Sequence, residues 1–219
     1  MLSNKVSGLM TREMMTASAS STVYDVIALM AAKNVGRVVI TDNQLHVGIF
    51  TEHDVLKRVM NKKLDAKKTS IKRVMTSPIR AVDQETRIVE ALGNMYQSRF
   101  RHLLVRGEKG TIVGMVSMRR ILKLAVESGR GLTETQTIGS IISGELITIE
   151  ASQSVYETIE LMIKKNTDCV IVLSNGNPQG IFTERDVLKR VAVQEIDTKK
   201  TPIAKVMTVD FVTMADSAL

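Results

Sequence analysis

The chain has 219 residues, of which 44% are hydrophobic, and its 30 Lys and Arg against 23 Asp and Glu give a formal net charge of +7. This composition allows one or two folded domains, while 3% aromatic residues and no Trp leave little to stack nucleic-acid bases, so we expect no nucleic-acid partner. One cysteine, no signal-peptide pattern and no apolar run that could span a bilayer predict a cytoplasmic protein with no membrane partner.

The first stretch of the chain predicts the order strand, helix, strand, strand, helix. Apolar periodicity, turn residues and capping residues place these elements at 15–19, 23–30 with Ser20 and Ser21 as caps, 37–40, 47–50 and 54–59. A run of basic residues follows, which favours anionic partners or a solvated connector: Lys62, Lys63, Lys67, Lys68, Lys72 and Arg73.

The same order returns twice more along the chain. The second stretch predicts strands and a helix at 79–82, 86–97, 103–105 and 112–116, and the third at 146–149, 155–159 and from Cys169. The Gly-rich and Thr-rich segment 129–137 is typical of a linker. A fourth stretch begins at Ile203–Met207 with a strand candidate at Asp210–Met214, and we expect it to fold onto the third stretch.

One twelve-residue junction is duplicated almost without change. Gly48–Val59 returns 132 residues later as Gly180–Val191, and only His53 differs, being replaced by Arg185. A looser copy begins at Gly114. Repetition at fixed spacing predicts a protein built from copies of one unit, and the 132-residue offset makes the duplicated object a pair of units.

The junction has two interpretations. Thr51 stands at a helix N-cap with Asp54 at the third helical position, which is close to the capping-box pattern. The same start of a helix also offers N–H donors to a phosphate, to which Thr51 adds a hydroxyl, while Asp54 can accept both hydroxyls of a ribose. A helix cap and a nucleotide site therefore both remain possible for these residues.

The second copy departs from this pattern, and no catalytic or metal-binding arrangement is recognisable. Ser117 keeps the hydroxyl, but Arg120 replaces the aspartate, so this copy can contact phosphate and should hold ribose poorly. His46, His53 and His102 lack metal-ligand spacing, and no nucleophile motif or phosphate loop occurs. We therefore expect neither an enzyme nor a metal site.

The repeated unit resembles the CBS domain family, the repeats named after cystathionine β-synthase. The resemblance rests on the Gly-h-x-[Ser/Thr]-x-x-Asp junctions and on the Val-Met-Thr openings at Val74–Thr76 and Val206–Thr208. It implies an α+β fold of layered α/β type, made of tandem β-α-β-β-α repeats that pair as Bateman modules. The implied repeats and linker are 1–70, 71–128, the linker 129–137, 138–202, and the start of an incomplete fourth repeat at 203–219.

The resemblance also implies ligand sites in clefts between paired repeats. In members that bind adenine nucleotides, the junction hydroxyl contacts phosphate, the aspartate contacts ribose, and the segment entering the first strand meets the adenine. Arg101 and His102 match the place of basic phosphate contacts, although a histidine before a buried strand is as often a packing residue. The implied ligand-binding residues are Thr16, Ala17, Ser18, Gly48, Ile49, Thr51, His53, Asp54, Arg101, His102, Ser117, Arg119, Arg120, Leu146, Gly180, Ile181, Thr183, Arg185 and Asp186.

These features predict a regulatory protein that senses AMP, ADP, ATP or a related adenosyl ligand and controls an unidentified protein. The alternative is a ligand-free assembly module whose apolar helical faces form oligomers. In either case we expect a homodimer or higher oligomer, with the helices of the third repeat covered by another chain.

Overall fold

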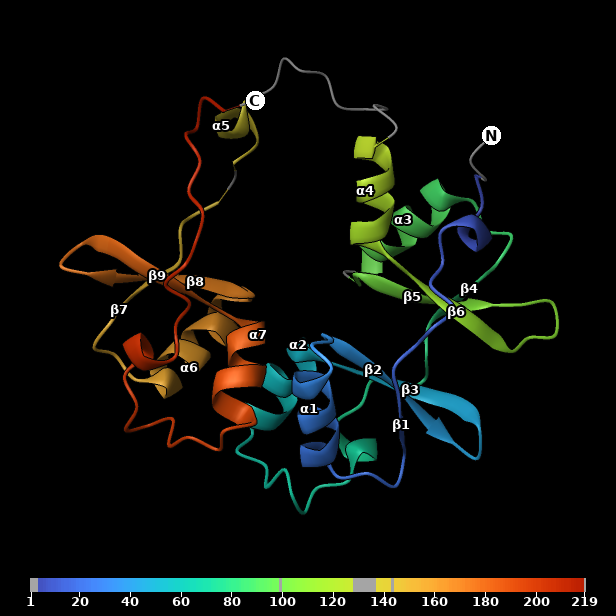
Figure 1. The fold of residues 1–219 in the computed structure, drawn as a ribbon, viewed down its shortest axis with the longest axis horizontal. Coiled ribbons are helices and arrows are strands. Elements are labelled where there is room, and N and C mark those ends of the chain that lie inside the picture. Colours follow the sequence, from blue (N-terminus) through green and yellow to red (C-terminus); the bar gives the residue numbers. More distant parts are fainter. Residues whose placement is uncertain (1–3, 99, 128–136, 143, 219) are drawn as a thin grey trace. The chain divides into compact units, whose positions relative to one another are not determined.

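The computed structural model describes residues 4–98, 100–127, 137–142 and 144–218 (Figure 1). The chain divides into two compact units, and each takes two separate stretches of sequence. One unit contains 1–16 and 78–136, and the other contains 17–77 and 137–219. The predicted linker at 129–137 lies, except for Thr137, outside the described residues. The fold is the predicted α+β fold, with a three-stranded sheet in each of three repeats.

The first repeat forms a sheet of order β1-β2-β3. Its elements are β1 (Thr16–Ser18), α1 (Val23–Ala32), β2 (Arg37–Asp42), β3 (Leu45–Thr51), the single turn α2 (Glu52–Asp54) and the π-helical segment η2 (Val55–Met60). The cap of α1 is Thr22 and not the predicted Ser20 or Ser21, because Thr22 and Asp25 close a capping box.

The third repeat has the same architecture. Its elements are α5 (Ile138–Ile141), β7 (Thr148–Glu150), α6 (Val155–Lys165), β8 (Cys169–Ser174), β9 (Asn177–Thr183), α7 (Glu184–Asp186) and the π-helical segment η4 (Val187–Ala192). β7 runs parallel to β8, and β8 runs antiparallel to β9. The register is also shared, because Cys169 faces Thr183 in one sheet as Arg37 faces Thr51 in the other.

The second repeat forms the other compact unit. Its elements are β4 (Ala81–Asp83), α3 (Ile88–Ser98), β5 (His102–Arg106), β6 (Ile112–Ser117) and α4 (Met118–Glu127), preceded by the short helix η1 (Val6–Gly8). Its core consists of Val6, Leu9, Met10, Ala91, Met95, Leu103, Val105, Val116 and Ile121. The first residues of the chain are thus part of the core of the second repeat.

The opening segments of the first and second repeats each pack against the other repeat. Thr11 bridges Met115 in the second repeat, while Thr76 bridges Ile49 in the first, and η3 (Ile71–Arg73) belongs to that repeat's packing. The opening of the fourth stretch, with η5 (Ile203–Lys205), folds onto the third repeat as predicted, since Thr208 bridges Ile181. A junction glycine lies under each opening. A Cβ added at Gly48 would collide with Met75, and a Cβ added at Gly114 or Gly180 would collide with the backbone carbonyl oxygen of Thr11 or Thr208.

The helices of the third repeat are covered from within the chain. α6 contacts η2, α7 contacts α2, and η4 contacts both η2 and α1. We call this contact between the first and third repeats the seam. The expectation that another chain covers these helices is therefore wrong, because the equivalent helices of the first repeat already occupy that face.

The strand predicted at Asp210–Met214 does not form. These residues have no regular secondary structure, and Val212 is 92% exposed. The equivalent strand β4 is held by parallel pairing with β5, and the described part of the chain contains no strand paired with 210–214. A strand that lacks a partner has no ladder of hydrogen bonds to hold it extended. One further boundary differs from the prediction, since the strand predicted at 146–149 is β7 and begins only at Thr148.

Candidate functional site

Thr51 and Asp54 form the first half of the candidate site at the end of β3. The Thr51 backbone N–H and hydroxyl both donate to Asp54 Oδ2, at 2.9 and 2.8 Å. The Asp54 N–H donates in return to Thr51 Oγ1 at 3.3 Å. This is a complete capping box, so the local sequence does form the helix start that its pattern predicts.

The other oxygen of Asp54 joins the junction to the next opening segment. Asp54 Oδ1 lies 3.5 Å from Thr76 Oγ1, which donates to it, and 3.3 Å from Arg58 Nε. Arg58 Nη1 then donates to the carbonyl oxygens of Val74 and Met75, at 2.9 and 2.8 Å. An ionised carboxylate accepts about four hydrogen bonds, and the Asp54 carboxylate has four N–H and O–H groups within 3.5 Å, of which the two from Thr51 are the closest.

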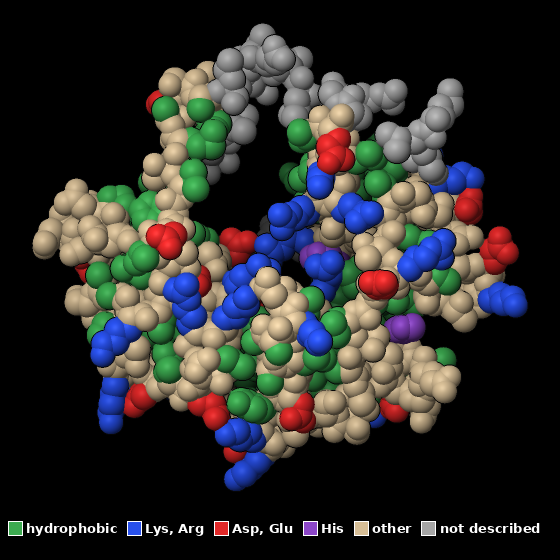
Figure 2. All heavy atoms as spheres, in the orientation of Figure 1, with side chains coloured by type: hydrophobic (Ala, Val, Ile, Leu, Met, Phe, Trp, Pro, Cys, Tyr) green, Lys and Arg blue, Asp and Glu red, His purple; other side chains and the backbone are tan. Residues whose placement is uncertain are grey.

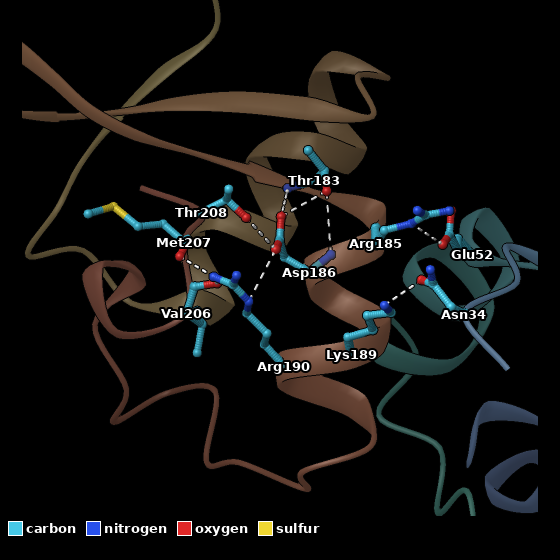
Figure 3. A network of polar contacts seen from close by, with 10 residues as sticks. All are labelled: Asn34, Glu52, Thr183, Arg185, Asp186, Lys189, Arg190, Val206, Met207 and Thr208. Atoms are coloured by element: carbon cyan, nitrogen blue, oxygen red, sulfur yellow. Dashed lines mark hydrogen bonds and ion pairs between the residues drawn. The ribbon is translucent and has the colours of Figure 1, made fainter. Parts of the chain in front are cut away.

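The third repeat builds the same group of four side chains (Figure 3). The Thr183 N–H and hydroxyl donate to Asp186 Oδ2 at 2.9 and 2.8 Å, and Thr208 Oγ1 donates to Asp186 Oδ1 at 2.9 Å. Arg190 Nε lies 3.5 Å from Oδ1, and its Nη1 donates to the carbonyl oxygens of Val206 and Met207. We call these two groups, Thr51/Asp54/Arg58/Thr76 and Thr183/Asp186/Arg190/Thr208, the junction tetrads.

Burial sets the electrostatics of the tetrads. Asp54 is 4% exposed and Asp186 is 6% exposed. Burial raises the pKa of Asp54 above its ordinary value, and the hydrogen bonds from Thr51 and the charge of Arg58 oppose that rise. A buried carboxylate with so many donors is held in one orientation, which suits both a rigid cap and a preformed acceptor.

Among the described residues of the second repeat, no equivalent tetrad is present. Ser117 Oγ accepts the Arg120 N–H at 3.2 Å, and the side chains of Arg119 and Arg120 are exposed. Arg101 precedes β5 and its carbonyl accepts the Met118 N–H at 2.9 Å, while His102 begins β5 opposite Ser117. The basic residues predicted for phosphate therefore gather around one end of β5 and β6.

The remaining predicted ligand residues divide into three groups. Gly48, Ile49, Gly180 and Ile181 lie in β3 and β9 beside the bridging threonines. Thr16, Ala17 and Ser18 form β1, and Leu146 is 72% exposed before β7. The side chains of His53 and Arg185 lie at the seam, because His53 contacts Glu184 and Arg185 contacts Glu52.

Sequence reasoning did not include Arg58, Thr76, Arg190 and Thr208. A signal was present, because both pairs recur at the 132-residue offset and the threonines end the two Val-Met-Thr openings. The role of Thr76 and Thr208 was hidden because they come from segments that the sequence order assigns to the following repeat, and each arginine contacts the carbonyl groups of that same segment.

The comparison with known families decides the assignment. The sequence profile of the CBS domain matches residues 6–61, 71–127 and 138–193, which together make up most of the chain. The chain belongs to the CBS domain family.

Similar proteins agree with this membership. The CBS domain-containing protein CBSCBSPB1 of Arabidopsis thaliana is 26% identical over 89% of this chain and 42% of its own length. This CBS chain thus spans less than half the length of that relative. The crystal structure of MJ1225 from Methanocaldococcus jannaschii shares the fold, with a TM-score of 0.77 and 16% identity over 95% of this chain and 84% of that one. CBSX2, solved in complex with AMP, shows a TM-score of 0.50 and 22% identity over 58% of this chain and all of its own.

Three further features of the described residues concern metal ions, the membrane and Cys169. Within the described residues, no three or more His, Cys, Asp and Glu side chains lie so that they could hold a metal ion. None of the helices in that part of the chain is long and apolar enough to cross a membrane. Cys169 is half-buried in β8, and burial raises the pKa of its thiol, which leaves it a poor nucleophile.

Proposed function

We propose that this CBS protein is regulatory and not catalytic, and that it binds an adenine nucleotide at the junctions of its first and third repeats. The observation that carries the proposal is the pair of junction tetrads. A helix cap requires only the threonine and the aspartate, whereas each tetrad adds an arginine and a second threonine from another segment. A carboxylate fixed beside a helix start and a hydroxyl suits a ribose with an attached phosphate.

Binding would require one existing donor to leave the aspartate. In the first tetrad the weakest candidate is Thr76, whose hydroxyl lies 3.5 Å from Asp54 Oδ1, beyond the usual length of an O–H···O bond. A ribose hydroxyl can take that place while Thr51 retains its cap. In the third repeat the corresponding bond from Thr208 is 2.9 Å, so the two repeats should differ in affinity.

The position of Thr76 suggests how binding is transmitted. Thr76 follows the two carbonyl groups held by Arg58, and two residues further on the chain passes into the other compact unit at Pro78. A ligand that displaces Thr76 from Asp54 favours one arrangement of this segment over another. The nucleotide then acts by shifting a population between two states, in proportion to its differential affinity for them.

The proposal extends to AMP, ADP and ATP as ligand candidates and to an unidentified protein as the regulated target. CBSX2, a structural neighbour solved in complex with AMP, supports an adenine nucleotide as the ligand. In the second repeat, Arg101, His102, Ser117, Arg119 and Arg120 are proposed as contacts to phosphate groups. Thr16, Ala17, Ser18 and Leu146 are proposed to meet the adenine.

Calorimetry with AMP, ADP and ATP tests the function, and Asp54→Ala and Asp186→Ala identify the site. We expect each substitution to weaken binding at its own repeat by about tenfold, since a hydrogen bond to a charged group contributes roughly 1.5–3 kcal/mol. Asp25→Ala is the matched control, because Asp25 closes the same capping box with Thr22, at 3.0 and 2.7 Å, on an exposed helix start. If all three variants bind equally well, the aspartates are caps and the proposed site is wrong.

A ligand-free assembly role is the second candidate, favoured by an apolar face on the second repeat. Val89 and Tyr96 of α3 are 71% and 80% exposed, and Leu122 and Val126 of α4 are 52% and 59% exposed. The equivalent helices of the first and third repeats pack against each other. Sedimentation of Leu122→Asp beside the unchanged chain distinguishes the roles, because loss of a dimer without loss of nucleotide binding supports assembly through this face.

A further inference from the structure

The seam is built from pairs of residues related by the 132-residue repeat. Lys57 Nζ donates to Asn166 Oδ1 at 2.8 Å, and its counterpart Lys189 donates to Asn34 (Figure 3). Both asparagines have left-handed backbones, with φ of 53° and 51°. The seam is thus an internal pseudo-twofold contact, in which each end should repeat the chemistry of the other.

At one end of the seam a lysine is neutralised by the protein itself. Lys67 Nζ lies 5.0 Å from the centre of the Tyr24 ring, within the range of a cation–π contact. The same ammonium group lies 2.6 Å from Glu195 Oε2. The Tyr24 ring therefore stabilises this cation, and the Glu195 carboxylate neutralises its charge.

At the other end the carboxylate is replaced by a second cation. Lys199 lies 5.8 Å from the centre of the Tyr156 ring, as the repeat requires, but the counterpart of Glu195 is Lys63. Lys63 Nζ lies 4.8 Å from that same ring centre. Lys63 and Glu195 share a φ of 50°, so the backbone is the same and only the side chain differs.

Two ammonium groups that face one aromatic ring repel each other unless an anion joins them. The nearby acidic groups are already engaged: Glu160 accepts the Tyr156 hydroxyl, and Asp197 accepts the N–H groups of Lys199 and Lys200. Among the described residues, no ion pair of Lys63 or Lys199 with an acidic side chain is present. At the opposite end, the Glu195 carboxylate balances the charge of the single lysine Lys67. At this end, a doubly charged oxyanion would balance the charges of the two lysines.

We propose that Lys63, Lys199 and Tyr156 form a phosphate-binding site at this end of the seam, separate from the junction tetrads. Lysine ammonium groups bind phosphate as point charges, and an anion between Lys63 in the first repeat and Lys199 in the third fastens the seam. The ligand is a free phosphate or the phosphate group of a larger molecule.

The test is a titration of the whole chain with inorganic phosphate at constant ionic strength, followed by amide signals in two-dimensional NMR spectra. Saturable shifts are expected at Lys63, Tyr156 and Lys199, with no comparable change at Tyr24 and Lys67. In Lys63→Glu, which copies the opposite end, the apparent affinity should fall by at least about tenfold. Comparing inorganic phosphate with AMP separates a free phosphate site from one that needs the nucleoside.

The reciprocal substitution supplies a gain of function. Glu195→Lys places two lysines over Tyr24 and should create a second set of saturable shifts there. Unchanged phosphate binding in Lys63→Glu, or no new site in Glu195→Lys, would overturn the proposal. Asp54→Ala should leave these phosphate shifts intact. The test of this phosphate site can therefore be negative while nucleotide binding at the tetrads is confirmed, and phosphate binding here can be confirmed while nucleotide binding at the tetrads is not.

Discussion

His53 Nδ1 lies 2.5 Å from Glu184 Oε1 across the seam. The counterpart of this contact joins Arg185 Nε to Glu52 Oε1 at 3.1 Å. The one residue that differs between the two junctions is therefore a seam residue. Glu184 is almost completely buried, with 4% of its side chain exposed, so the charge state of its partner matters.

His53→Arg should stabilise the chain. An arginine stays charged at every accessible pH, whereas a histidine is charged only when protonated. The free energy of unfolding measured by urea at pH 8 should rise by roughly 0.5–1 kcal/mol, the upper range for partly exposed ion pairs. Arg185→His is the matched control and should lower it. A less stable His53→Arg would show that the guanidinium does not fit beside Glu184.

The pKa values of Asp54 and Asp25 should shift in opposite directions, although both residues close a capping box. Burial raises the pKa of Asp54, while hydrogen bonds from Thr22 lower that of the exposed Asp25. The stability that Asp25 contributes is therefore present above its ordinary pKa and is lost as pH falls through its lowered value. The contribution of Asp54 is present at lower pH and is lost as pH rises through its raised value. Carboxyl carbon shifts followed by NMR measure both, and an Asp54 midpoint below that of Asp25 would contradict the role given to burial.

Gly180→Ala should destabilise the third repeat. The added Cβ would lie 2.7 Å from the carbonyl oxygen of Thr208 and 2.8 Å from Met207 Sδ. The oxygen belongs to the backbone that bridges Ile181, so it cannot turn aside and the cost should be about 1–3 kcal/mol. Gly93→Ala is the control in α3, where nothing lies within 4 Å, and it should gain about 0.5–1 kcal/mol. Thermal unfolding compares the two, and equal effects would mean that the opening segment shifts freely.

Arg120→Asp should improve the start of α4. The first turn of this helix has no acidic residue, and a carboxylate there complements the helix dipole and restores the box with Ser117. The free energy of unfolding should rise by roughly 0.5–1 kcal/mol. Calorimetry on the same variant shows whether nucleotide stoichiometry rises as well. Unchanged stoichiometry with weaker affinity would mean that Arg120 serves a phosphate bound elsewhere.

Sequence alone determined the repeat, most of the strands and helices, and the helix caps at the junctions. These depend on residues close together in the chain: the threonine and the aspartate of each junction are three positions apart, and their hydrogen bonds form in any context that allows the helix. The apolar periods that predict strands and helices are equally local. The 132-residue offset between the two junctions also predicted that the first and third repeats share one architecture.

Tertiary structure decided which segments complete which repeat. Residues 6–10 pack in the core of the second repeat, and Thr76 and Thr208 reach back to Asp54 and Asp186. Only the fold could show that His53 faces Glu184 or that Lys63 and Lys199 both lie near the Tyr156 ring. Contacts between residues far apart in the chain depend on how whole faces pack, and packing is shared among many side chains, so no local pattern records it.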